Sequence, residues 1–83
     1  MRNIVIYSKD YCPYCNAAKS LLKEKGWSFT DIEVGYDSAL FAEMVERSGR
    51  RTVPQIFNEY GHIGGLDDLV KRLDNVERHT SAA

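Results

Sequence analysis

The chain has 83 residues, of which 43% are hydrophobic and 28% charged, an ordinary composition for one small globular domain. Its 11 basic and 12 acidic side chains give a formal net charge of -1, which excludes a general attraction to nucleic acid or to anionic membranes. The apolar run at residues 4–7 is too short for a signal peptide or a membrane span. We therefore expect a single cytoplasmic domain over residues 1–83, with a frayed tail at 77–83.

The first third of the chain predicts a strand, a helix and a second strand. Residues 3–7 form a short β-branched run that is typical of a buried strand. In residues 13–25 four apolar side chains recur at helical spacing, with Pro13 suited to the first turn and Gly26 to the end. These side chains are Ala17, Ala18, Leu21 and Leu22. Residues 27–34 alternate imperfectly between apolar and polar side chains and favour a second strand.

The middle of the chain predicts a second helix and a hairpin. Asp37 is suited to cap a helix that ends at Gly49. One face of this helix carries Leu40, Phe41, Met44 and Val45. Residues 55–57 and 62–63 flank a turn-like segment and favour a β-hairpin.

A third helix is expected after the Gly64-Gly65 pair, which interrupts the regular pattern. Asp67 and Asp68 lie in its first turn, where the helix dipole favours negative charge. The side chains expected to face inward are Leu69, Val70 and Leu73.

The predicted order of elements is β-α-β-α-β-β-α. A β-α-β opening implies a parallel strand pair, and the closing hairpin adds antiparallel strands. The result is an α/β thioredoxin-like fold, in which three helices flank a four-stranded mixed sheet.

Cys12 and Cys15 are the only cysteines, and two residues separate them. A disulfide between them would close too small a loop to stabilise the fold through chain entropy, so the pair indicates redox chemistry. A zinc site would need four ligands, and only His62 and His79 remain as candidates, so we expect no metal. Cys12 lies at the expected helix N-terminus, where free N–H groups favour a thiolate. Such a thiolate is also a good leaving group, which suits a catalyst that must turn over.

Three segments together resemble the signature segments of the bacterial dithiol glutaredoxins. They are Cys-Pro-Tyr-Cys at 12–15, Thr-Val-Pro-Gln-Ile-Phe at 52–57 and Gly-Gly-Leu-Asp-Asp-Leu at 64–69, and the resemblance runs from about residue 3 to about residue 73. It implies a glutathione-dependent oxidoreductase that reduces protein disulfides and glutathione mixed disulfides. Cys12 would be the nucleophile and Cys15 the resolving thiol. No bound cofactor would be needed, since glutathione is the co-substrate.

The same resemblance implies a glutathione site. Lys9 would meet the glycyl carboxylate, and Asp67 would pair with the ammonium group. The segment Gly64-Gly65-Leu66 would allow close backbone approach, and free N–H groups at the start of the third helix would hold the γ-glutamyl carboxylate. The other expected contacts are Tyr14, Thr52, Val53 and Pro54, with a cis Val53-Pro54 bond whose exposed backbone pairs with a cysteinyl substrate as a short strand does.

The expected partners are glutathione and disulfide-containing or glutathionylated proteins, with ribonucleotide reductase as a family-level candidate, and the expected state is a monomer. Two alternatives stay open. One is a small redoxin served by thioredoxin reductase. The other is a scaffold for an iron–sulfur cluster with glutathione as a ligand, which Pro13 disfavours because cluster-binding relatives usually have a smaller residue there. The roles of Arg47, Arg50 and Arg51 stay open.

Overall fold

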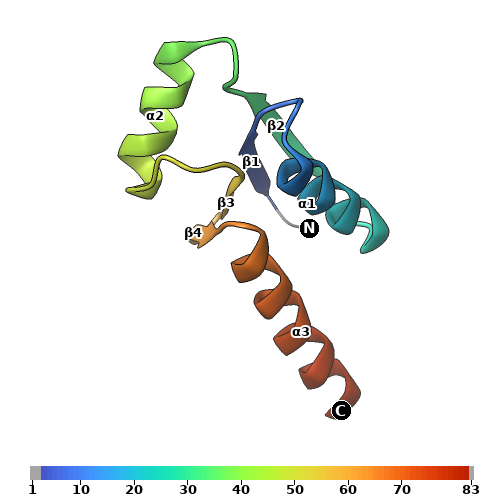
Figure 1. Cartoon of the computed structure of the whole chain (residues 1–83). Coiled ribbons are helices and arrows are strands. Elements are labelled where there is room, and N and C mark those ends of the chain that lie inside the picture. The colour runs from blue at the N-terminus through green and yellow to red at the C-terminus, as the bar shows by residue number, and fades with distance from the viewer. Residues whose placement is uncertain (1–2, 83) are drawn as a thin grey trace.

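The structure is a computed structural model that describes residues 3–82, with side chains described through residue 74. In that part of the chain the elements are β1 (Ile4–Ser8), α1 (Pro13–Glu24), β2 (Phe29–Glu33), α2 (Ser38–Ser48), β3 (Gln55–Asn58), β4 (Gly61–Gly64) and α3 (Leu66–Ala82). This order confirms the predicted β-α-β-α-β-β-α arrangement (Figure 1). The frayed tail expected at residues 77–83 lies outside the described side chains and stays a prediction.

The strands form one mixed sheet in the order β2-β1-β3-β4. β1 and β2 are parallel, as expected for strands joined through α1, and β1 pairs antiparallel with β3. The β3–β4 hairpin is antiparallel, with an irregularity in register between Ile56 and Phe57. The C-terminal ends of the parallel strands β1 and β2 therefore lie side by side at one end of the sheet, and α1 starts at that end.

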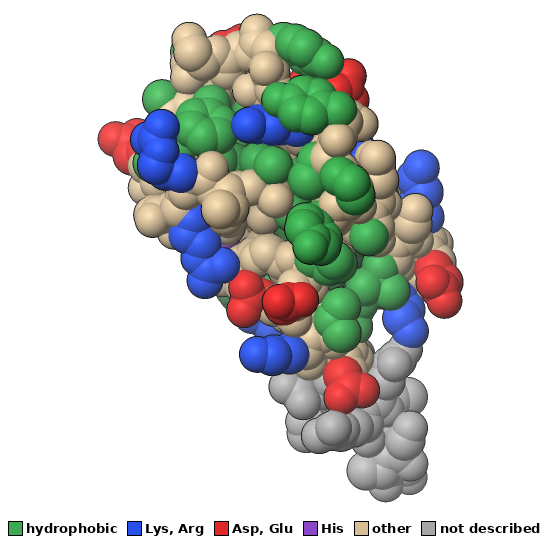
Figure 2. Space-filling view, viewed as in Figure 1, with side chains coloured by type: hydrophobic (Ala, Val, Ile, Leu, Met, Phe, Trp, Pro, Cys, Tyr) green, Lys and Arg blue, Asp and Glu red, His purple; other side chains and the backbone are tan. Residues whose placement is uncertain are grey.

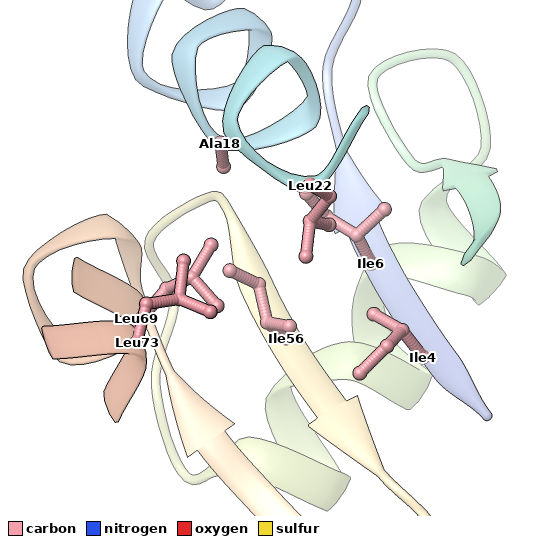
Figure 3. Close-up of a cluster of buried hydrophobic side chains, with 7 residues drawn as sticks. All are labelled: Ile4, Ile6, Ala18, Leu22, Ile56, Leu69 and Leu73. Carbon is pink, nitrogen blue, oxygen red and sulfur yellow. The ribbon is translucent and has the colours of Figure 1, made fainter. Parts of the chain in front are cut away.

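The sheet separates two hydrophobic clusters, because successive side chains of a strand point to opposite faces. On one face the sheet packs against α1 and α3, and these buried side chains are drawn in Figure 3: Ile4, Ile6, Ala18, Leu22, Ile56, Leu69 and Leu73. The other face packs against α2, and its buried side chains are Tyr7, Val34, Met44 and Phe57. Figure 1 shows α1 and α2 on opposite sides of the strands. The fold is thus three layers with the sheet in the middle.

Both ends of α1 follow the local sequence. Cys12 is the N-cap residue with an extended backbone, and Pro13 opens the first turn. At the other end Gly26 has a φ of 74°, and its N–H bonds to the Lys23 carbonyl. The next N–H, of Trp27, bonds to the Leu22 carbonyl, which completes a Schellman ending.

The capping of α2 also confirms the sequence prediction. The Asp37 carboxylate accepts hydrogen bonds from the N–H groups of Ala39 at 3.0 Å and Leu40 at 3.1 Å. Gly49 ends the helix with a left-handed φ of 74°. The loop that follows α2 brings the Val53 carbonyl oxygen to 3.9 Å from the Cys12 sulfur.

The inward face of α3 differs from the prediction at one position. Leu69 and Leu73 are buried as expected, but Val70 is 48% exposed, so its predicted inward position was wrong. Leu66, Leu69 and Leu73 already form the stripe that packs on the sheet. Val70 lies one position further round the helix, beside Leu21 of α1 and Lys25, the residue that caps α1. Among the described residues, no helix combines the length and apolarity that a membrane crossing needs.

Candidate active site

The Cys12 thiol lies where three segments meet. Its Sγ atom accepts a hydrogen bond from the Cys15 N–H at 3.3 Å and lies 3.9 Å from the Val53 carbonyl oxygen. The Cys12 N–H donates to the Lys9 carbonyl at 3.2 Å, which fixes the turn between β1 and α1. Cys12 remains partly exposed. The helix end thus places a backbone donor and the positive end of the helix dipole beside an accessible sulfur.

Cys15 has the opposite environment one turn further along α1. It is fully buried, whereas Cys12 is partly exposed. Burial raises its pKa to about 12, and the hydrogen bond and charge of Cys12 act in the same direction. Cys15 is therefore a protonated thiol at neutral pH as long as the Cys12 sulfur is not part of a disulfide.

The Val53-Pro54 peptide bond is cis, as the sequence resemblance implied. This bond lies in the loop that precedes β3 and faces Cys12 through the Val53 carbonyl. The loop is held from behind by Gln55, whose Nε2 donates to the Thr52 carbonyl at 3.0 Å and to the Thr52 hydroxyl at 3.1 Å. A cysteinyl ligand bonded to Cys12 would meet a backbone edge that is already fixed.

A groove of about 420 Å³ opens between this loop and the start of α3. Most of the predicted glutathione contacts line it, from three separate parts of the chain: Tyr14, Thr52, Val53, Pro54, Gly65, Leu66 and Asp67. The Tyr14 side chain at its rim is 67% exposed. Figure 2 shows acidic side chains near the start of α3, flanked by basic side chains on one side and by hydrophobic ones on the other.

Lys9 does not line this groove. It borders a neighbouring hollow of about 510 Å³ together with Tyr36 and Phe41. Its Nζ lies 5.2 Å from the centroid of the Phe41 ring and 6.0 Å from that of Tyr11. The predicted contact of Lys9 with a glycyl carboxylate stays a prediction.

Sequence reasoning did not identify Asp68 and Arg50 as a pair in the groove. The Asp68 carboxylate accepts a hydrogen bond from the Gly65 N–H at 3.0 Å and pairs with the Arg50 guanidinium at 3.2 Å. These contacts, the Gly65 hydrogen bond first, hold the pKa of Asp68 below its ordinary value. The signal was present, because Gly65 and Asp68 have the spacing of a capping pair. The cap belongs to Asp68, so Asp67 is left facing the groove.

The three arginines before the cis bond point to different partners. Arg47 lies over the Phe57 ring at 4.3 Å and hydrogen-bonds the Tyr7 hydroxyl. Arg50 binds Asp68, and Arg51 lies 5.4 Å from the Phe41 ring. Of the three, only Arg50 lines the groove.

The chain is similar to known proteins both in sequence and in structure. The family model described as Glutaredoxin matches residues 4–63. Glutaredoxin 3 of Escherichia coli strain K12 is 54% identical over 69 residues, which cover 83% of each chain. The solution structure of a glutaredoxin from Brucella melitensis has a TM-score of 0.78 and 45% identity, covering 94% of this chain and 85% of that one. A buckwheat glutaredoxin–glutathione complex has a TM-score of 0.81 and 32% identity, covering 89% and 70%.

Proposed function

The chain belongs to the glutaredoxin family, and from that premise we propose a glutathione-dependent reductase of protein disulfides and glutathione mixed disulfides. The observation that carries the proposal is the pairing of two unlike thiols at one helix end. Cys12 is accessible and hydrogen-bonded from the backbone, whereas Cys15 is buried and protonated. An exposed nucleophile beside a shielded second thiol is the arrangement that a two-step exchange requires.

In the first step the Cys12 thiolate attacks one sulfur of a protein disulfide. A new S–S bond forms between Cys12 and that sulfur, the old S–S bond breaks, and the other protein sulfur leaves as a thiolate. Cys15 then attacks the Cys12 sulfur, which releases the second protein thiolate and leaves the Cys12–Cys15 disulfide. The proton lost by Cys15 goes to the departing thiolate. Two glutathione molecules restore the dithiol and leave as glutathione disulfide.

The environment of Cys15 supports this order of events. Two of the effects that raise its pKa are the hydrogen bond and the charge of Cys12. Both depend on a free Cys12 sulfur, so forming the mixed disulfide on Cys12 weakens them. Cys15 therefore becomes easier to ionise at the step in which it acts.

For a glutathione mixed disulfide one thiol is sufficient. Cys12 attacks the glutathionyl sulfur and releases the protein thiolate. A second glutathione then attacks the same glutathionyl sulfur, which frees the Cys12 thiolate and forms glutathione disulfide. We assign the γ-glutamyl carboxylate to the backbone N–H groups of Leu66 and Asp67, because Asp68 already occupies the Gly65 N–H. The Asp67 carboxylate would pair with the ammonium group, and Tyr14 would flank the ligand. Lys9 would reach the glycyl carboxylate from the neighbouring hollow.

This proposal needs no bound cofactor, and it places a monomer in a reducing cytoplasm. Protein partners would be those with an accessible disulfide or glutathionylated cysteine, and ribonucleotide reductase is one candidate. The glutathione seen in the buckwheat complex supports the choice of co-substrate.

A coupled assay tests the proposal. NADPH oxidation is followed with a glutathionylated peptide, glutathione and glutathione reductase, and each component is omitted in turn. We expect turnover only in the presence of glutathione. Turnover sustained by thioredoxin reductase without glutathione would favour the redoxin alternative, and visible absorbance of freshly purified protein would favour the cluster scaffold.

A further inference from the structure

His62 lies on β4, behind the loop that faces Cys12. Its ring packs on Phe57 with centroids 4.9 Å apart and a tilt of 42°. Its Nε2 atom lies 2.7 Å from Oε1 of Gln55, the neighbouring side chain on β3. His62 is not among the residues that line the groove, and its hydrogen bond reaches the loop through Gln55.

Gln55 connects His62 to the loop that precedes β3 through hydrogen bonds. Its side chain is fully buried, and its amide nitrogen bonds to both the carbonyl and the hydroxyl of Thr52. A backbone carbonyl accepts hydrogen bonds and never donates them, so the nitrogen of the amide must face Thr52. The amide oxygen then faces His62, which must donate from a protonated Nε2.

We propose that His62 is a positioning residue for the thiol–disulfide exchange. By donating its Nε2–H to Gln55, it locks the amide that holds Thr52, and with Thr52 the Val53 backbone that faces the Cys12 sulfur. The role in exchange rests on the function proposed above. The hydrogen-bonded chain from His62 to Thr52 is a property of the protein without substrate.

Without the His62 donor, the Gln55 oxygen would be a buried acceptor with no partner. A buried polar atom in that state is costly, and rotating the amide would only bring its oxygen against the Thr52 carbonyl. The loop would therefore be held less firmly. The surroundings of His62 favour a neutral ring. Burial lowers the pKa of His62 and the Arg50 charge lowers it further, while the Asp68 charge has a smaller effect in the opposite direction.

Three variants separate positioning from simple stability. His62→Phe keeps a ring against Phe57 but removes the donor. His62→Gln restores an N–H donor at a similar reach. Ile63→Val shortens the neighbouring β4 side chain, which packs on the core cluster, and leaves the chain from His62 to Thr52 untouched.

Two readouts are taken. The first is nuclear magnetic resonance of the reduced protein, which reports the tautomer of His62 and the solvent exchange of the Gln55 side-chain amide. We expect a neutral ring protonated at Nε2, and slow amide exchange that becomes fast in His62→Phe and slow again in His62→Gln. The second readout is turnover of a glutathionylated peptide. There His62→Phe should raise KM about five-fold with little change in kcat, as expected for the loss of one neutral hydrogen bond in the binding loop.

A His62 ring protonated only at Nδ1, or equal amide exchange in wild type and His62→Phe, would overturn the proposal whatever the glutathione assay shows. An equal rise in KM for Ile63→Val and His62→Phe would overturn it as well, because loss of β4 stability would then explain the effect. The glutathione requirement of the wild-type protein is measured separately, so the proposed function and the role of His62 can fail independently.

Discussion

The backbone N–H of Cys15 points at the Sγ atom of Cys12 from 3.3 Å, so the residue that supplies the second thiol also supplies a hydrogen bond to the first. The two sulfurs have unlike environments although both lie at the start of α1. A backbone donor and the N-terminal end of the helix lie beside the partly exposed Cys12, whereas burial opposes negative charge on Cys15. This asymmetry leads to the first prediction.

Alkylation of the reduced protein at pH 7 should modify Cys12 and leave Cys15 almost untouched. Cys15 is buried and its pKa is about 12, so its thiolate is scarce and shielded. Iodoacetamide labelling followed by tandem mass spectrometry measures both sites. In denaturant both thiols should react alike, which serves as the control. Comparable labelling of Cys15 in the native protein would contradict this assignment.

Asp67→Asn should raise KM for a glutathionylated peptide and change stability little. Asp67 lines the groove, and the cap of α3 is made by Asp68 instead. Losing the carboxylate partner of an ammonium group should weaken binding by about 1 to 3 kcal/mol if the pair is desolvated. Steady-state kinetics and a urea titration measure the two effects. An unchanged KM would remove Asp67 from the binding site.

Asp68→Asn should instead change stability, and in a pH-dependent way. The pKa of Asp68 is lowered by the Gly65 N–H first and by Arg50 second, so its charged form is stabilised in the folded state. That stabilisation is present above the ordinary pKa and is lost as pH falls through the lowered one. The Asp68 and Arg50 side chains are both substantially exposed. We therefore expect the free energy of unfolding to fall by up to about 1 kcal/mol at pH 7.

Urea titrations of wild type and Asp68→Asn at several pH values check this prediction. The two curves should converge at acid pH, where Asp68 is protonated. High salt should reduce the difference at pH 7 by screening Arg50. A difference that stays constant down to about pH 2 would show that the charge of Asp68 is not its source.

The features that could be predicted from sequence are those decided by neighbouring residues. Asp37 and Gly49 bound α2 because a cap and a left-handed ending each need only a few residues around them. The Cys12 position follows from the same local logic. The cis state of Val53-Pro54 did not, since base rates favour trans, and only the family resemblance indicated it.

Features that depend on how distant elements meet were not predicted. Val70 has the right residue type for the core, but the placement of α3 against α1 leaves it 48% exposed. Arg50 and Asp68 are 18 residues apart, and their ion pair exists only because the loop before β3 returns to the start of α3. His62 has no triad-like context in the sequence, and its partner Gln55 is reached across the hairpin. The Arg50–Asp68 ion pair and the His62–Gln55 contact have no signature in the sequence, whereas the Gly65–Asp68 capping contact has one.

The last prediction divides the chemistry between the two cysteines. Cys15→Ser should keep substantial turnover of a glutathionylated peptide, because a second glutathione can displace Cys12 from its mixed disulfide. The same variant should lose most reduction of a protein disulfide, since no Cys12–Cys15 disulfide can form. Turnover of the peptide and reduction of a protein disulfide are measured side by side.

Cys12→Ser should lose both activities. The remaining thiol at Cys15 is buried, its burial still opposes ionisation, and it lacks the open N-cap position that exposes Cys12 to substrate. Thermal unfolding of both variants shows whether each still folds, so that a loss of activity can be assigned to the missing sulfur. If Cys12→Ser kept near-normal turnover while Cys15→Ser were inactive in both assays, Cys15 would be the nucleophile. The unlike environments of the two thiols would then not decide which of them attacks.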